Sequence, residues 1–269
     1  MTQNQVISTL AEKLENNPLV LGFLLVGSHA RKNVYTASHY SDIEAYIVVK
    51  DKDIKKLEKE LPNLVRSLGK VIFSYKNQWA GFSTVFKNLL RLELPLVKLS
   101  DLSSVFSRPT AQDVEVIIDK TNGKLEKILS ARPKTIDLER VFLDTVTDFW
   151  YMAIVAIQYY KKGEYWNARH AQEVSMIPSL IKFIELLENS NLLLLESNKR
   201  IEQLVSKKSV EMLKEICSHY EKDKIKKSLE KNIKEFSSLS VKIAEKFNYK
   251  YPTDIEKAVK PQLENLLKS

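Results

Sequence analysis

Hydrophobic positions in the first half of the chain alternate between helical and extended spacing. Val6, Leu10 and Leu14 recur every four residues, which is the period of an amphipathic helix. The continuous apolar run 19–26 is typical of a strand buried on both faces. A second apolar segment follows at 43–49, and shorter runs indicate further strands. The predicted elements are helices over 2–16 and 53–68, and strands over 19–26, 43–49, 70–75, 81–86 and 89–97.

Beyond Pro133 the spacing is helical to the last residues. Gly163 separates the first two helices, and the low totals of 6 glycines and 8 prolines agree with long helices. The predicted helices cover 137–161, 164–188, 208–220, 225–247 and 254–267. We therefore predict an α/β (α+β) fold in two domains, a mixed sheet with flanking helices over 1–132 and an all-helical bundle over 133–269.

Composition narrows the class of protein. A hydrophobic content of 44% and a charged content of 28% are those of a soluble globular protein. The longest apolar run, 149–157, is shorter than the ~20 residues that span a bilayer, so it predicts a buried helix. Residues 1–5 show no secretion signal, and Cys217 has no second cysteine to pair with and is expected to pack. We expect a cytoplasmic protein without a membrane partner.

The net charge of +8 is spread over both halves of the chain. The lysine-rich stretch 222–227 is interrupted by an acid and has helical spacing, which favours a solvated helix face over a track for nucleic acid. Basic and aromatic residues are not interleaved as in single-strand binders, so no nucleic-acid partner is expected. A modest positive field also suits an enzyme that binds a triphosphate.

The residues after the first apolar run are candidates for binding phosphate. The run ends at Gly27, where a missing side chain lets a ligand approach the backbone. Ser28 adds a hydroxyl, and the first amides of a short helix favour an anion. Arg31 and Lys32 supply positive charge beside them. These four residues are the predicted nucleotide-binding set.

Two carboxylates begin the next predicted strand. Asp42 and Glu44 are two residues apart, so in a strand they point to the same face, while Ile43, Ala45 and Ile47 point to the other. Side-by-side charges of this kind need compensation, and Mg²⁺ binds carboxylates together with substrate phosphates. A pair that binds a cation beside a loop that binds an anion is what metal-assisted phosphoryl transfer requires.

A third acid has the same periodicity. The leucines of the segment 90–96 alternate, so Arg91 and Glu93 share the opposite face. If this strand neighbours that of Asp42, Glu93 faces the same cleft as a general base or a further metal ligand. The alternative is the solvated face of an edge strand. The histidines show no ligand spacing, and His29 and His39 are interpreted as bystanders near the phosphate site.

This combination resembles the nucleotidyltransferase superfamily, which includes DNA polymerase beta and antibiotic-modifying enzymes. Gly27-Ser28-x-x-Arg31 followed by Ser41-Asp42-Ile43-Glu44 is similar to the motif of kanamycin nucleotidyltransferase. The wider chain resembles the two-domain lincosamide nucleotidyltransferases, with likeness in Tyr75-Lys76-Asn77, the segment 89–93, Ala131-Arg132-Pro133 and Lys162-Gly163-Glu164-Tyr165. The loop Asn33–Tyr40 is slightly longer than in those enzymes, and the helical half matches by pattern more than by identity.

The resemblance implies a function and a set of residue roles. Asp42 and Glu44 would bind Mg²⁺, Gly27, Ser28 and Arg31 would hold the triphosphate of ATP, and Glu93 takes the position of the catalytic base. The implied fold is a nucleotidyltransferase sheet followed by a helical domain that contributes to the acceptor pocket. The implied reaction is transfer of a nucleoside monophosphate from ATP, or another nucleoside triphosphate, to a hydroxyl of a small-molecule antibiotic.

The acceptor stays open among several alternatives. A lincosamide is the first hypothesis, and an aminoglycoside or another small acceptor is the second. Aromatic and apolar residues favour the lincosamide if they line a pocket, although such a stripe is also typical of plain core; the candidates are Trp79, Phe149, Trp150, Tyr151 and Trp166. A non-catalytic, antitoxin-like protein is the third, but it predicts eroded metal ligands, and both carboxylates are present. A homodimer and a monomer are equally open.

Overall fold

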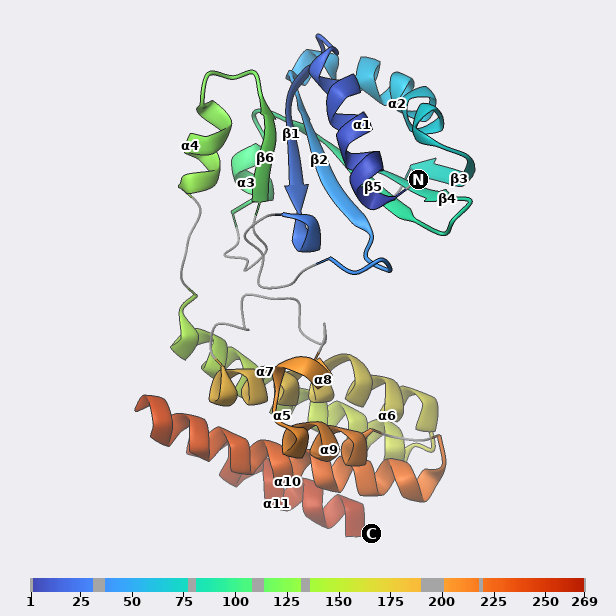
Figure 1. The fold of residues 1–269 in the computed structure, drawn as a ribbon. Helices are drawn as coiled ribbons and strands as arrows, with labels where there is room; N and C mark the ends of the chain where they lie inside the picture. The colour runs from blue at the N-terminus through green and yellow to red at the C-terminus, as the bar shows by residue number, and fades with distance from the viewer. Residues whose placement is uncertain are drawn as a thin grey trace. The chain divides into compact units, whose positions relative to one another are not determined.

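The computed structural model describes residues 2–30, 37–76, 81–107, 114–131, 136–189, 201–217 and 220–268. The chain forms two compact units, Met1–Thr135 and Ile136–Ser269 (Figure 1). The domain boundary predicted between 132 and 133 falls on residues outside the described ones. The fold is the predicted one, a mixed sheet with flanking helices followed by a helical unit.

A six-stranded sheet forms the centre of the N-terminal unit, in the order β3-β4-β5-β2-β1-β6. β2 and β5 are parallel, and the other neighbours are antiparallel, so the sheet is mixed. The strands are β1 (Val20–Val26), β2 (Ile43–Val49), β3 (Val71–Lys76), β4 (Gly81–Phe86), β5 (Arg91–Lys98) and β6 (Val114–Asp119).

Helices cover both faces of this sheet (Figure 1). α1 (Gln3–Glu15) and α2 (Ile54–Leu68) pack on one face, where Ile43, Ala45 and Ile47 are fully buried. α3 (Leu102–Val105) and α4 (Lys124–Ser130) pack on the other, against Leu24 and Val48. The second face is the one to which Glu44 points, because side chains alternate along β2. Short helical turns follow β1 and β2, namely η1 (Gly27–His29) and η2 (Asp51–Asp53).

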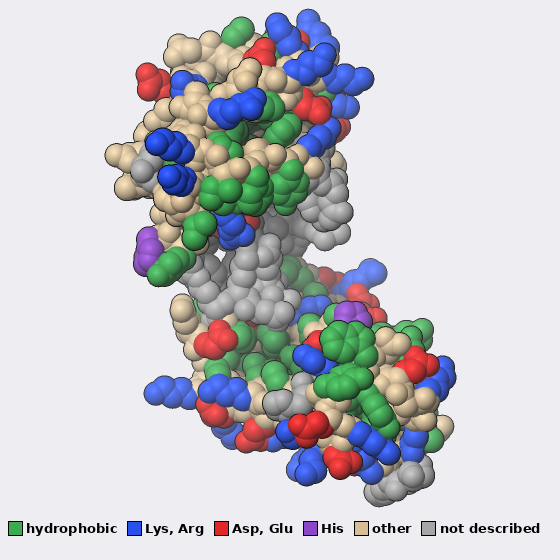
Figure 2. Space-filling view, turned by 90° about the vertical axis from the view of Figure 1, so that its right-hand side faces the viewer, with side chains coloured by type: hydrophobic (Ala, Val, Ile, Leu, Met, Phe, Trp, Pro, Cys, Tyr) green, Lys and Arg blue, Asp and Glu red, His purple; other side chains and the backbone are tan. Residues whose placement is uncertain are grey.

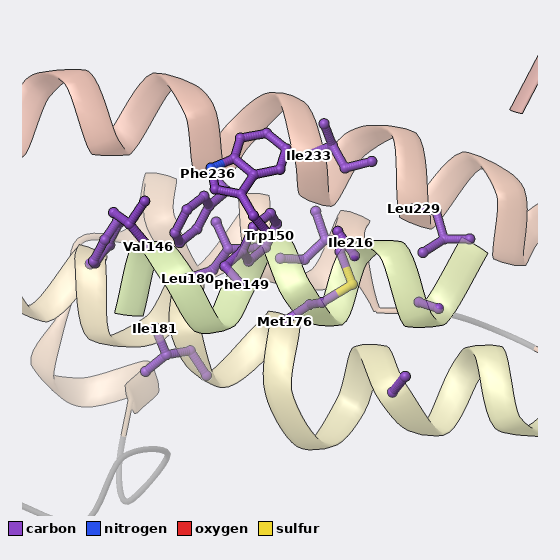
Figure 3. Close-up of a cluster of buried hydrophobic side chains, with 14 of the residues drawn as sticks. Val146, Phe149, Trp150, Met176, Leu180, Ile181, Ile216, Leu229, Ile233 and Phe236 are labelled. Atoms are coloured by element: carbon purple, nitrogen blue, oxygen red, sulfur yellow. The ribbon is translucent and has the colours of Figure 1, made fainter. Parts of the chain in front are cut away.

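The C-terminal unit is helical throughout its described residues. Its helices are α5 (Leu138–Lys161), α6 (Tyr165–Ala171), α7 (Ile177–Glu188), α8 (Ile201–Leu204), α9 (Lys207–Ile216), α10 (Lys222–Phe247) and α11 (Thr253–Lys268). A π-helical segment, η3 (Gln172–Met176), joins α6 to α7 within the region predicted as one helix. The core is aromatic: Phe149 stacks on Phe236 with ring centroids 3.6 Å apart, and Trp150 lies edge-on to the same ring (Figure 3).

Three elements of the N-terminal unit were not predicted, and each has a weak sequence pattern. α3 has only four residues, and α4 follows a turn at Asn122-Gly123, where both residues have positive φ. β6 is an edge strand in which only Ile118 is buried, so it lacks the apolar run that marks β1.

Two sequence interpretations concern single features of the helical unit. Cys217 is exposed, so the prediction that it packs is wrong, because the neighbouring Ile216 takes the buried position at the end of α9. α5 is the one described helix long and apolar enough to cross a membrane by length and composition. Its apolar positions pack in the core of the unit, as predicted for 149–157.

Candidate functional site

Three carboxylates lie on one face of the sheet, where β1 ends and β2 and β5 begin. Register places Glu44 opposite Val26 on one side and opposite Glu93 on the other. Asp42 directly precedes β2, two residues before Glu44. The structure thus brings the predicted Asp42, Glu44 and Glu93 to the same end of the sheet, because parallel pairing of β2 with β5 aligns the starts of the two strands.

Gly27 lies at the same end of the strands, in a position where a side chain would meet the Glu44 carboxylate. Its φ is +73°, in the left-handed region that favours glycine, and a Cβ would approach Glu44 Oε2 to 2.8 Å. Gly27 begins the 3-10 turn that also contains Ser28 and His29. The structure therefore places the Gly27 backbone beside the Glu44 carboxylate, and the approach of a phosphate to Gly27 stays a prediction.

Two further residues contact the carboxylates. An Arg91 guanidinium nitrogen lies 2.9 Å from Asp42 Oδ2, and Ser83 Oγ donates a hydrogen bond of 2.5 Å to Glu93 Oε2. Ser83 is buried, and β4 pairs it directly with Glu93. The sequence analysis placed Arg91 on this face without a partner and missed Ser83. The sequence signal for Ser83 is weak, because it is one of two adjacent polar residues, Ser83 and Thr84, in a strand that is otherwise apolar.

Burial shifts the pKa of two neighbours of the site, His29 and Tyr46. Burial lowers the pKa of His29 below its ordinary value, and the negative charge of Asp42 opposes that shift. Burial also raises the pKa of Tyr46, with a further contribution from Glu44. His29 is thus neutral above its lowered pKa, which suits a bystander more than a fixed positive charge for phosphate. His39 packs against the ring of Tyr40, with centroids 3.7 Å apart.

Some predicted residues cannot be placed in the site. Arg31, Lys32 and Trp79 lie outside the described residues. Phe149 and Trp150 are core residues, exposed by at most 1%, so neither can line an open acceptor pocket. Tyr151 and Trp166 are exposed on the helical unit.

The donor set suits Mg²⁺, which prefers carboxylate oxygens. Among the described residues, no group of three or more His, Cys, Asp or Glu side chains is arranged to hold a metal ion. Two carboxylates, Asp42 and Glu44, are fewer ligands than Mg²⁺ takes, and Mg²⁺ usually binds one or two carboxylates together with substrate phosphates and water. The residues fit a metal that is bound together with a triphosphate.

Comparisons with known proteins identify the family. The model of a family described as streptomycin adenylyltransferase matches residues 1–266. The crystal structure of an aminoglycoside 6-adenyltransferase from Bacillus subtilis is similar over 100% of both chains, with 17% sequence identity and a TM-score of 0.45. No curated protein sequence matches the chain. The family match covers nearly the whole chain, and it names streptomycin and not a lincosamide. The chain therefore belongs to the streptomycin adenylyltransferase family, and it is an adenylyltransferase of the nucleotidyltransferase class that its motif residues predict.

Proposed function

We propose that the protein transfers the adenylyl group of ATP, with Mg²⁺, to a hydroxyl of an aminoglycoside antibiotic and releases pyrophosphate. The observation that carries this proposal is the shared face of Asp42, Glu44 and Glu93 beside the Gly27-Ser28 turn. Paired carboxylates at a backbone turn suit a metal–triphosphate complex, and a third carboxylate beside them suits proton removal.

Each residue has a stated role in this proposal. Asp42 and Glu44 hold Mg²⁺, which when bound supplies positive charge to the triphosphate oxygens. Gly27 and Ser28 leave space and donors for phosphate, and Arg31 and Lys32 add positive charge. Glu93 accepts the proton of the acceptor hydroxyl. The oxygen of the acceptor hydroxyl then forms a bond to the α-phosphorus, and the bond from that phosphorus to the pyrophosphate oxygen breaks.

Ser83 positions the Glu93 carboxylate in this scheme. Its hydroxyl donates to one carboxylate oxygen from the neighbouring strand, so the carboxylate is held by a buried partner. Groups held in this way keep the orientation that proton transfer needs. The hydroxyl is a positioning group and does not itself exchange the proton.

The family description favours an aminoglycoside acceptor over a lincosamide. The aromatic argument for a lincosamide is also weakened, because Phe149 and Trp150 belong to the core of the helical unit. The lincosamide hypothesis then rests on the likeness of the wider chain to the lincosamide enzymes, and it is an outcome of the experiment below. The antitoxin-like alternative is set aside, because the chain is an adenylyltransferase by family.

The test is a transfer assay with purified protein, ATP and Mg²⁺. Streptomycin and kanamycin serve as aminoglycosides, lincomycin and clindamycin as lincosamides, and products are detected by mass. We expect an adenylylated aminoglycoside, and no product from Asp42→Asn. Glu58→Gln is the matched control, because Glu58 forms an exposed ion pair with Lys76 on the same unit.

Each outcome has a defined meaning. Product from lincosamides alone would replace the proposed acceptor and leave the reaction class intact. Retention of activity in Asp42→Asn would remove Asp42 from the site. Equal activity with a chelator present would overturn the role of Mg²⁺.

Three further expectations remain predictions. They are a contribution of residues 133–269 to the acceptor pocket, a cytoplasmic location, and a choice between homodimer and monomer. Light scattering of the purified protein decides the last.

A further inference from the structure

Arg91 forms an ion pair with Asp42, one of the three carboxylates of the site. Its Nη2 lies 2.9 Å from Asp42 Oδ2, and the side chains are 57% and 29% exposed. Arg91 begins β5, two residues before Glu93, so both side chains leave the same face of the strand. The ion pair thus crosses from β5 to the residue that precedes β2.

The position of this pair matters because the site is crowded with negative charge. Glu44 and Glu93 are direct neighbours across the parallel strands, and like charges in such positions repel. Asp42 adds a third carboxylate on the same face. A guanidinium on Asp42 lowers this repulsion as long as nothing else with positive charge is bound.

We propose that Arg91 is the counter-ion of Asp42 in the metal-free protein and competes with the divalent cation for that carboxylate. The inference rests on the proposed function, in which Asp42 is a metal ligand. Arg91 and a metal cannot both take the lone pairs that Oδ2 directs at the guanidinium. The inference assigns the metal to Oδ2, and a metal bound through that oxygen displaces the Arg91 guanidinium.

The consequence is coupling between metal and nucleotide. Without nucleotide, the cation has to displace Arg91 and finds only a partial shell of carboxylates. With nucleotide, phosphate oxygens complete the set of metal ligands. The displaced guanidinium can then donate hydrogen bonds to phosphate oxygens instead of to Asp42. The enzyme then holds the metal weakly alone and firmly with the triphosphate.

The geometry allows such an exchange. The Arg91 side chain is more than half exposed, so it can rotate from Asp42 into solvent without leaving a buried group unpaired. Exposed ion pairs contribute little to stability, so breaking this one does not disturb the strand. A buried arginine would oppose the metal permanently, whereas an exposed one opposes it reversibly.

The test measures Mn²⁺ affinity of the full chain by calorimetry, without nucleotide. Arg91→Met should tighten Mn²⁺ binding by about fivefold, the size expected from loss of one competing exposed ion pair. Arg91→Lys keeps the charge and should bind nearer to the unaltered protein. Arg140→Met is the matched control, because Arg140 forms an exposed pair with Asp144 on α5; it should leave the affinity unchanged.

A second titration uses a non-hydrolysable ATP analogue. The analogue should strengthen Mn²⁺ binding less in Arg91→Met than in the unaltered protein, because the competitor is already absent. Far-ultraviolet circular dichroism and a denaturant midpoint in chelator establish that each variant is folded.

Failure of the inference is distinct from failure of the proposed function. If Asp42→Asn loses Mn²⁺ binding but Arg91→Met binds it equally or more weakly, Arg91 is no competitor, and only the inference is overturned. If Asp42→Asn binds Mn²⁺ as well as the unaltered protein, the metal assignment fails, and the inference fails with it.

Discussion

At the scale of single residues, the chain places ionisable groups in environments that differ sharply. Glu93 lies on a strand beside another carboxylate and accepts a hydrogen bond from a buried serine. Glu185 on α7 is 3% exposed in the core of the helical unit. The two glutamates lead to different predictions, one for catalysis and one for stability.

Replacing Glu93 by glutamine should lower kcat by roughly 10²–10⁴-fold, because an amide cannot accept the proton of the acceptor hydroxyl. ATP affinity should be nearly unchanged, because the proposed function assigns nucleotide binding to Gly27, Ser28 and the metal and not to Glu93. Steady-state kinetics and equilibrium ATP binding check both quantities. A joint loss of kcat and ATP affinity would show that Glu93 is a metal ligand. A normal kcat would show that Glu93 does not belong to the active site.

Glu185 gives the protein a pH-dependent stability. Burial raises its pKa to about 7, so between roughly pH 4.5 and 7 the folded state holds a proton that the unfolded state has lost. Its contribution to the free energy of unfolding is therefore fully present below the unfolded pKa and falls as pH rises through about 7.

Glu185→Gln should consequently gain stability relative to the unaltered protein as pH rises. The gain between pH 5 and pH 8 should be about 2 kcal/mol, from the shift in pKa between the two states. Urea denaturation at both pH values measures it, with exposed Glu211→Gln as control. A constant difference between pH 5 and 8 would contradict the prediction.

At the scale of elements, the sheet and the helical unit differ in how they present their surfaces. β3 is an edge strand with Ile72, Phe73 and Tyr75 each more than half exposed. Figure 2, which views the side of the molecule drawn at the right of Figure 1, shows a band of hydrophobic side chains on the N-terminal unit. The helical unit has a different feature, a polar side chain that the π-helical segment η3 places inside the core.

That buried polar group is Gln172. Its Oε1 accepts hydrogen bonds from Ser228 Oγ at 2.7 Å and from Asn232 Nδ2 at 3.3 Å, and all three residues are buried. The network links η3 to α10. A polar group inside a core stabilises the fold only while its partners are satisfied.

Gln172→Leu should lower the free energy of unfolding by about 1–3 kcal/mol, because Ser228 and Asn232 each lose an acceptor in a buried environment. Gln158→Leu, on an exposed position of α5, should change it by less than about 0.5 kcal/mol. Urea denaturation compares them, and equal midpoints for the two variants would show that the network adds no stability.

At the scale of the whole molecule, the two units have separate cores and unequal roles. The carboxylate site belongs entirely to the N-terminal unit, between β1, β2 and β5. Ligand binding to that site stabilises the folded state by an amount set by the ratio of free ligand to its Kd.

ATP with Mg²⁺ should raise the melting temperature by roughly 5–10 °C at a hundredfold excess over Kd, and ATP with a chelator by much less. The two mixtures should differ because the Asp42 and Glu44 carboxylates repel the triphosphate unless a cation lies between them and the phosphates. Differential scanning fluorimetry with both mixtures checks it. Equal shifts would place the nucleotide at another site.

The local patterns of the chain determined much of the fold and the paired carboxylates. β1, β2 and β4 were predicted within a residue. β1 is an apolar run that ends at Gly27, β2 is apolar apart from Glu44, and β4 begins at Gly81. Asp42 and Glu44 share a face because of the two-residue period of a strand, which any extended segment has. Such features depend on neighbours along the chain, and the sequence contains them directly.

Tertiary structure decided the contacts between segments. Parallel pairing of β2 with β5 brought Glu93 to Glu44, and antiparallel pairing of β4 with β5 brought Ser83 to Glu93. The same pairing of β2 with β5 set Arg91 beside Asp42. Strand order and register are chosen by long-range packing of whole faces, since a slip of one residue turns every side chain to the other face. The carboxylates were therefore predictable from the sequence, whereas the partners that orient and neutralise them were not.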